Sequence, residues 1–438
     1  MNKKKILQLL LKLLASAVVR KYHPLVIGIT GSVCKTSTRN AIEAVLRPSF
    51  SVRASIKSYN NEWGVPLTIL GEQGHGKNIT EWLGVLCRAT GLLLRHHGHY
   101  PHILILEMGA DKPGDIAYLI SIASPTMGIL TAIGEAHMEF FKTPKALAEE
   151  KKHIITCLPP AGLAILNSDD ATVWGLRGST IANVVSVGMS HKADFMAKET
   201  LVVYEEQNAR KAPIGIRTNM HHKGACVPLT LQGMLGEGHI MSALIAYAVG
   251  KHMGLMVLET TARLKKYIPP PGRMRILHGI KHTTLIDDSY NASPRAMKMA
   301  LHTLQSLNVP QGGEKWALLG DMKELGALTP EAHKELGGIA AHSNLDWLVT
   351  VGASGALIYR GAREGGIRED RAFHFTTPQE AGKFVQQKLE PHDVVLIKAS
   401  RAMHFEKITQ ELMAEPLKAH ELTVQCFCNY SPAHAHFS

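Results

Sequence analysis

A short segment near the N-terminus has the residues of a phosphate-binding loop. The apolar run Leu25 to Ile29 leads into Gly31-Ser-Val-Cys-Lys-Thr-Ser37, and helical spacing follows from Arg39 to Leu46. In such a strand, loop and helix, backbone N–H groups bind phosphate oxygens, a lysine neutralises the β and γ phosphates, and a hydroxyl binds Mg²⁺. The segment therefore predicts an ATP and Mg²⁺ site in which Lys35 is catalytic and Thr36 is a metal ligand; an ordinary glycine-rich turn is the alternative. The residues expected to contact the nucleotide are Gly31, Ser32, Val33, Cys34, Lys35, Thr36 and Ser37.

Cys34 departs from the usual composition of such a loop, because glycine normally precedes the lysine. A side chain at this position can crowd the phosphate or resist the backbone angles that the loop needs. We therefore expect weakened nucleotide binding. A thiol beside Lys35 and a helix N-terminus is also expected to have a lowered pKa.

Two more candidate metal ligands lie where predicted strands end. Glu107 follows the apolar run Ile103 to Leu106, and His137 follows the run Gly128 to Ile133. Parallel strands bring their carboxyl ends to one edge of a sheet, where an acid can reach a Mg²⁺ beside a phosphate loop. A solvated strand end for Glu107 and a structural role for His137 remain open as alternatives.

Alternating elements indicate an α/β fold throughout the chain. The 438 residues are 45% hydrophobic and 19% charged, which excludes a disordered protein. Apolar runs that end in Gly, Asp or Glu alternate with helical stretches, the pattern of mainly parallel sheets covered by helices. The strands predicted in this way are 25–29, 103–106, 128–133, 163–166, 184–187, 284–286, 316–319, 347–351 and 394–397. Helices are predicted to begin near Ser293, Thr329, Thr377 and Ala402, and residues 201–231 are predicted to add antiparallel strands to the first domain.

The run Tyr267-Ile-Pro-Pro-Pro-Gly272 divides the chain, because three prolines remove hydrogen-bond donors and fix φ. We therefore predict an amphipathic helix over residues 1–22, a central ATP-binding domain over 23–268, a Rossmann-like α/β domain over 269–418 and an irregular tail over 419–438. The tail carries Cys426, Cys428, His434 and His436, whose spacing is not a recognised zinc motif.

Charge and cysteine content indicate the kind of partner. The net charge of +11 favours anionic partners, but the basic residues are dispersed without interleaved aromatic residues, which argues against nucleic acid. Six scattered cysteines indicate a reduced compartment, the cytoplasm. The N-terminal helix is expected to pack on its own domain, with weak membrane-surface association as the alternative. Its apolar positions are Ile6, Leu9, Leu10, Leu13, Leu14 and Ala17.

The phosphate loop resembles the T-G-x-x-G-K-T loop of the Mur ligases, and further segments match motifs of that family in the same order. They are Asn60-Asn-Glu-Trp-Gly-Val-Pro66, Glu107-Met-Gly-Ala110, Ile133-Gly-Glu-Ala-His137, Asn167-Ser-Asp-Asp170, Gly272-Arg-Met274, Asp287-Asp-Ser-Tyr-Asn-Ala-Ser-Pro294, Gly320-Asp-Met-Lys-Glu-Leu-Gly326 and Lys398-Ala-Ser-Arg401. The resemblance covers residues 25–415 and favours the branch of the family that adds D-alanyl-D-alanine.

This resemblance implies an ATP-dependent, ADP-forming acid–D-amino-acid ligase of peptidoglycan synthesis, monomeric and cytoplasmic. Its implied partners are UDP-N-acetylmuramoyl-tripeptide and D-alanyl-D-alanine, joined through an acyl phosphate. About two dozen residues precede the first predicted strand, so the uridine-binding domain usual at that point in the family is expected to be missing. The alternatives are a sister ligase acting on another carboxylate and, given Cys34, Ser293 and Ala399, a catalytically impaired nucleotide-binding protein.

The family also implies roles for individual residues. Glu107, His137 and Lys151 match metal-binding positions, the lysine as a carbamate, with Lys152 leaving the register uncertain by one. Arg273 matches an arginine that reaches the γ-phosphate. Asp288 and Asn291 match nucleotide contacts, and the implied substrate-binding residues are Asn60, Asn61, Lys398, Ser400 and Arg401.

Overall fold

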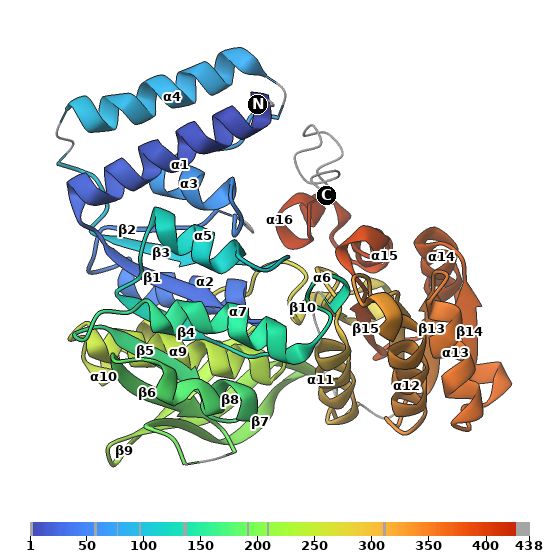
Figure 1. The fold of residues 1–438 in the computed structure, drawn as a ribbon. Helices are drawn as coiled ribbons and strands as arrows, with labels where there is room; N and C mark the ends of the chain where they lie inside the picture. The colour runs from blue at the N-terminus through green and yellow to red at the C-terminus, as the bar shows by residue number, and fades with distance from the viewer. Residues whose placement is uncertain are drawn as a thin grey trace.

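Two β-sheets, one in each half of the chain, organise the protein (Figure 1). The computed structural model describes residues 3–56, 59–76, 78–95, 98–134, 138–190, 192–207, 210–309 and 312–425. Both sheets are mainly parallel and both are flanked by helices, so the predicted α/β class is confirmed.

The first sheet has nine strands in the order β2-β3-β1-β4-β5-β6-β7-β8-β9. Strands β2 to β7 run parallel to their neighbours, whereas β7, β8 and β9 are antiparallel to one another, as expected for the appended segment. Their bounds are β1 Leu25–Thr30, β2 Val52–Ala54, β3 Ile103–Glu107, β4 Met127–Leu130, β5 Leu163–Asn167, β6 Asn183–Gly188, β7 Phe195–Gln207, β8 Arg210–His222 and β9 Ala225–Gln232.

Helices cover both faces of this sheet, which is why its central strands are apolar on both sides. One apolar cluster joins the sheet to α2 and α9, and a second joins it to α1, α3, α5 and α7. The helices are α1 Lys3–Tyr22, α2 Lys35–Leu46, α3 Gly64–Leu70, α4 Ile79–Leu94, α5 Asp115–Ile122, α6 Met138–Phe141, α7 Pro144–Thr156, α8 Ala171–Gly175, α9 Glu237–His252 and α10 Val257–Leu264.

The second sheet has six strands in the order β10-β11-β15-β12-β13-β14, with only β10 antiparallel to its neighbour. Helices α11, α12 and α13 cover one face, and α14 and α15 cover the other. The strands are β10 Arg275–His278, β11 Thr284–Asp287, β12 Lys315–Gly320, β13 Trp347–Val351, β14 Ala372–Phe375 and β15 Val394–Lys398. The helices are α11 Pro294–Gln305, α12 Thr329–Ala341, α13 Gly355–Glu364, α14 Pro378–Lys388, α15 Glu406–Leu412 and α16 Ala419–Leu422.

Some predicted boundaries differ from the observed ones. The strand expected to reach Ile133 ends at Leu130, where the chain leaves the ladder and Ala132 accepts a hydrogen bond from the phosphate loop. The helix expected near Ala402 begins at Glu406, after a short 3₁₀ turn. The short edge strands β2, β10 and β14 were not predicted, because four or fewer residues carry no clear period.

Helix α1 packs on its own domain, as expected, but through a different face from the one predicted. Leu11, Ala15 and Val18 are fully buried, whereas Leu9 and Leu13 are 45% and 53% exposed. The helix is apolar around most of its circumference, so its hydrophobic spacing alone cannot select the buried face. Among the described helices, none is both long enough and apolar enough to span a bilayer.

Candidate active site

The phosphate loop begins at the carboxyl end of β1, between β3 and β4, where the strand order of the sheet reverses. Such switch points are the usual ligand sites of open α/β sheets. Gly31 has φ of 150°, and a Cβ there would lie 2.0 Å from Thr131 Oγ1. Thr131 Oγ1 in turn donates to the Val33 carbonyl at 2.6 Å, so the loop is fixed against the neighbouring strand.

Cys34 precedes α2 with φ of 65° and ψ of 3°, the left-handed conformation that disfavours residues with a Cβ. Its Sγ lies against α9, where a Cβ on Gly238 would be only 2.8 Å away. Burial raises the pKa of the Cys34 thiol to about 11. The expected lowering is therefore wrong, because removal from water outweighs the nearby cationic groups.

Lys35 and Thr36 begin α2 and reach the elements beside the loop. Lys35 Nζ donates to the Gly31 carbonyl at 2.6 Å, and burial lowers its pKa. Thr36 Oγ1 donates to Glu107 Oε2 at 3.1 Å, and Arg39 Nη1 lies 2.9 Å from Glu107 Oε1. Glu107 ends β3 and is 1% exposed, so it is not the solvated strand end left open by the sequence.

These oxygen donors suit Mg²⁺. A hydroxyl and a carboxylate already in contact, at the start of a phosphate loop, are hard ligands that a divalent cation would share with phosphate oxygens and water. Arg39 balances the carboxylate in their present arrangement. No three His, Cys, Asp or Glu side chains form a metal-binding group in the part of the chain that the structure describes, and His137 lies outside those residues.

Helix α7 directs two adjacent lysines in different ways. Lys151 is 1% exposed, and burial, together with the charge of Lys35, lowers its pKa to about 7. Lys152 lies at the surface and pairs with Glu149. Glu150 accepts hydrogen bonds from the N–H groups of Gly114 and Ile116 at the start of α5, which fixes the rotation of α7. Lys151 is therefore the lysine directed into the protein near the phosphate loop.

The segment between the two domains carries Arg273. Its guanidinium lies over the Tyr290 ring, 4.1 Å from the centroid, and its carbonyl contacts His239 Nε2 at 2.7 Å. His239 is buried in α9, its Nδ1 lies 2.9 Å from Tyr267 Oη, and burial lowers its pKa to about 4. A neutral imidazole that donates to the Arg273 carbonyl and accepts from Tyr267 accounts for both contacts.

Asp288 and Lys398 form a buried ion pair in the second domain. Lys398 Nζ lies 2.6 Å from Asp288 Oδ2 and also donates to the Asn291 carbonyl at 2.8 Å. Asp288 Oδ1 accepts from the Met274 N–H at 3.2 Å. Lys398 thus fixes the backbone that carries both predicted nucleotide contacts, and its side chain is 2% exposed.

The other predicted substrate residues have structural partners. Asn61 Oδ1 accepts from the N–H groups at the start of α3, and the Asn60 carbonyl accepts from Gly109 after β3. Ser400 Oγ accepts from the Lys323 N–H at 2.9 Å, and Arg401 pairs with Glu406. Ser37, expected at the nucleotide, is 6% exposed and interacts with the Tyr267 hydroxyl.

The two domains meet at the phosphate loop. Arg273, Arg295 and Asp288 of the second domain all act electrostatically on Cys34, and Arg273 also acts on Lys35. Arg39, His239, Tyr267 and Arg295 belong to this region but were not predicted as site residues. Arg39, Tyr267 and Arg295 stand beside a recognised motif or in the proline-rich run, which was a weak signal, whereas His239 lies 28 positions before that run and had none.

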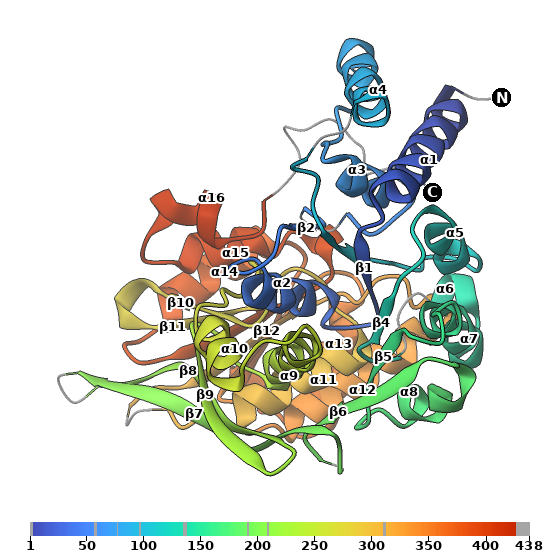
Figure 2. The same cartoon turned by 90° about the vertical axis from the view of Figure 1, so that its left-hand side faces the viewer.

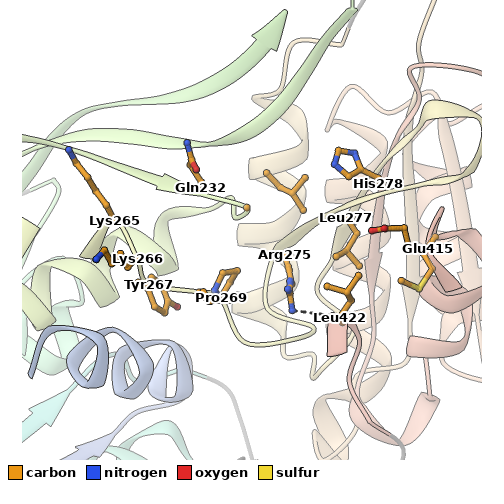
Figure 3. Close-up of a pocket in the computed structure, with 14 residues that line it drawn as sticks. Gln232, Lys265, Lys266, Tyr267, Pro269, Arg275, Leu277, His278, Glu415 and Leu422 are labelled. Atoms are coloured by element: carbon orange, nitrogen blue, oxygen red, sulfur yellow. Dashed lines mark hydrogen bonds between the residues drawn. The ribbon is translucent and has the colours of Figure 1, made fainter. Parts of the chain in front are cut away.

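A separate cleft of about 410 Å³ lies at the domain boundary, lined by Lys265, Lys266 and Pro269 on one side and by Arg275, His278 and Glu415 on the other (Figure 3). Arg275 donates to the Leu422 carbonyl there. None of the predicted site residues lines this cleft.

The two sheets and the loop between β1 and α2 define a protein of the P-loop α/β class. Residues 90–250 match the family model "Mur ligase middle domain", and residues 272–401 match "Mur ligase, glutamate ligase domain". The chain belongs to the Mur ligase family. It is 30% identical over 408 residues to UDP-N-acetylmuramoyl-tripeptide–D-alanyl-D-alanine ligase of Bacillus subtilis, a match that covers 93% of this chain and 80% of the relative.

Solved structures agree with this assignment. The MurF ligase of Thermotoga maritima in complex with ADP superposes with a TM-score of 0.73 at 26% identity, covering 92% of this chain and 82% of the other. MurF from Acinetobacter baumannii shares the fold, with a TM-score of 0.74 at 24% identity and coverage of 92% and 79%.

Proposed function

We propose that this protein is an ATP-dependent, ADP-forming ligase that joins D-alanyl-D-alanine to UDP-N-acetylmuramoyl-tripeptide in peptidoglycan synthesis. The observation that supports it best is the meeting of Lys35, Thr36 and Glu107 with Arg273 and Asp288 at one domain interface, in a chain 30% identical to a ligase of that name. The enzyme is proposed to act in the cytoplasm as a monomer.

In this reaction ATP transfers its γ-phosphoryl group to the terminal carboxylate of the tripeptide. The amine of D-alanyl-D-alanine then attacks the acyl phosphate and displaces phosphate. Lys35 from the loop and Arg273 from the second domain stabilise the charge that develops on the phosphoryl oxygens. Mg²⁺, held by Thr36 and Glu107, supplies further charge neutralisation when bound.

Closure of the two domains would orient the nucleotide and the two substrates relative to one another. The nucleotide would lie between the phosphate loop and the turn that carries Asp288 and Asn291. Lys398 binds this turn through the Asp288 carboxylate and the Asn291 carbonyl. We therefore assign Lys398 a positioning role for the nucleotide contacts. Bringing carboxylate and amine together in a closed site lowers the entropic part of the barrier.

Lys151 fits the carbamate that its family position implies. Carbamylation requires a neutral amine and CO₂, and an ordinary lysine with a pKa near 10.4 is neutral in only about one molecule in two thousand at pH 7. With a pKa of about 7, roughly half of the Lys151 side chains are neutral at that pH. Burial thus prepares this lysine, and not Lys152, for the modification.

A phosphate-release assay tests the proposal. Phosphate should appear only when ATP, UDP-N-acetylmuramoyl-tripeptide and D-alanyl-D-alanine are all present, with the amide product detected by mass spectrometry. Release with a different carboxylate or amine would instead identify a sister ligase. Binding of ATP without turnover on any acceptor would assign the protein to nucleotide-binding proteins that lack ligase activity, consistent with the strained Cys34.

A further inference from the structure

The N-terminal helix α1 presents an apolar stripe that the domain leaves uncovered. Ile6, Leu9, Leu10 and Leu13 are 40%, 45%, 40% and 53% exposed. They recur at intervals of three and four residues, so they share one face of the helix. The opposite face, with Leu11, is buried in the apolar cluster of the first sheet. The stripe is therefore held outward by the packing of its own helix.

Every charged residue of α1 is basic. Exposed Lys3, Lys4 and Lys5 form its first turn, directly before the stripe, and the helix contains no acidic side chain. Exposed leucines beside a lysine cluster on one rigid helix match the two components of an anionic lipid surface, its acyl boundary and its headgroup charge. An apolar protein groove would match the stripe alone, whereas an anionic lipid surface matches both the stripe and the all-basic charge of the helix.

The rest of the domain fixes α1 in this orientation. Lys21 Nζ donates to the carbonyls of Leu92, Leu93 and Arg95 at the end of α4. Lys12 Nζ lies 4.4 Å from the centroid of the Tyr118 ring of α5. Figures 1 and 2 both place α1 and α4 at the end of the molecule opposite β7 and β9. A surface in contact with α1 would therefore lie at the end of the molecule away from the antiparallel strands β7 and β9.

We propose that α1 docks this protein on anionic lipid membranes, with Ile6, Leu9, Leu10 and Leu13 entering the acyl boundary and Lys3 to Lys5 contacting the headgroups. The helix lies along the surface and does not cross it. This inference does not depend on the ligase activity, since vesicle binding is measured without substrates.

Sedimentation of the full-length protein with large vesicles tests the proposal. Vesicles of phosphatidylglycerol and phosphatidylcholine should bind the protein at low salt, whereas pure phosphatidylcholine should bind it at least tenfold more weakly. Raising the salt from 50 to 500 mM should release it, because exposed charges are screened. Absence of binding to the anionic vesicles at low salt would overturn the proposal.

Two sets of matched variants separate the contributions. Ile6→Ser/Leu10→Ser/Leu13→Ser should lower the partition coefficient at least tenfold, while Ile181→Ser/Leu201→Ser/Leu258→Ser, exposed elsewhere, should leave it unchanged. Lys3→Gln/Lys4→Gln/Lys5→Gln should lower it by about fivefold for each lysine removed. The same loss of charge in Lys198→Gln/Lys383→Gln/Lys407→Gln should have little effect.

Two outcomes would contradict docking through α1. Equal losses in the two lysine triples would show adsorption by net charge alone. A concentration-dependent dimer that is lost in the variant Ile6→Ser/Leu10→Ser/Leu13→Ser would show that a second copy of the protein covers the stripe. Circular dichroism of each variant verifies folding, which the exposure of every substituted residue should preserve.

Discussion

Arg295 in α11 of the second domain pairs with Asp170 at the start of α8 in the first, with Arg295 Nη1 2.5 Å from Asp170 Oδ2. The same nitrogen donates to the Ile133 carbonyl at 3.1 Å, and Asp170 Oδ2 also accepts from the Ile133 N–H. The next residue, Gly134, donates to Ser32 Oγ in the phosphate loop at 3.0 Å. A continuous polar path therefore links the second domain to the nucleotide loop.

We expect this pair to favour the closed arrangement of the domains. Arg295→Gln should lower kcat/KM about tenfold, and a double-mutant cycle with Asp170→Asn should give a coupling of about 1 kcal/mol, since the pair is partly exposed. Lys298→Gln is the matched control, because its partner Glu335 belongs to the same domain. Additive effects in the cycle would show that the ion pair has no part in closure.

Replacing Lys35 should abolish turnover while the fold persists. Lys35→Ala removes a half-buried cation whose charged form is already disfavoured, so folding stability should not fall, whereas phosphate release should drop by about 10²-fold or more. Lys388→Ala, at the exposed end of α14 in the second domain, serves as the control. Undiminished phosphate release by Lys35→Ala would exclude the assigned phosphate loop.

Lys151 and Lys152 form a natural matched pair. Lys151→Ala should inactivate the enzyme and regain part of its activity with added short-chain carboxylates, and stripping bicarbonate should lower the activity of the parent protein. Lys152→Ala should retain activity, because its half-buried side chain pairs with the exposed Glu149 on the same helix. The reverse pattern in the two variants would place the ligand at Lys152.

Cys34→Gly should remove the strain of a side chain in the left-handed backbone conformation. The substitution is expected to raise the free energy of unfolding by about 1 kcal/mol and to increase the affinity for ATP several-fold. Calorimetric titration and chemical denaturation measure the two effects. Unchanged ATP affinity would show that the loop accommodates the side chain, consistent with its place beside Gly238.

The thiol of Cys34 should resist alkylation at neutral pH. Its pKa of about 11 leaves little thiolate, whereas Cys87 and Cys226 are exposed. Peptide mapping after iodoacetamide at pH 7 should find Cys87 and Cys226 modified first. Preferential modification of Cys34 in the nucleotide-free protein would mean that this thiol is accessible and ionised.

We expect the free energy of unfolding to fall in mild acid because of the buried His239. Its pKa is lowered from 6.5 to about 4 by burial, so the unfolded chain binds the proton first as the pH falls. The free energy of unfolding is unaffected by this group above pH 6.5. It falls progressively between pH 6.5 and 4, by about 3 kcal/mol in total. His239→Gln should flatten this part of the denaturation profile, whereas exposed His252→Gln should follow the parent. Parallel profiles for all three proteins would contradict the assignment.

Local period and local motif were enough to predict the alternation of strands and helices, the turn between β1 and α2 and the α/β class. Glu107 was placed at a strand end correctly for the same reason. The proline-rich run Tyr267 to Gly272 could be predicted to interrupt helix and strand, since proline acts on its own backbone wherever it stands.

Which of two neighbouring side chains faces inward could not be predicted, because it depends on contacts between distant parts of the chain. Lys151 is buried and Lys152 is not because Glu150 ties α7 to α5, a contact between residues more than thirty positions apart. Burial likewise reversed the expected pKa shift of Cys34, since desolvation depends on elements distant in the sequence, such as α9, that pack beside the thiol. The buried face of α1 was set in the same way, because a helix that is apolar on most sides takes its orientation from the elements that surround it.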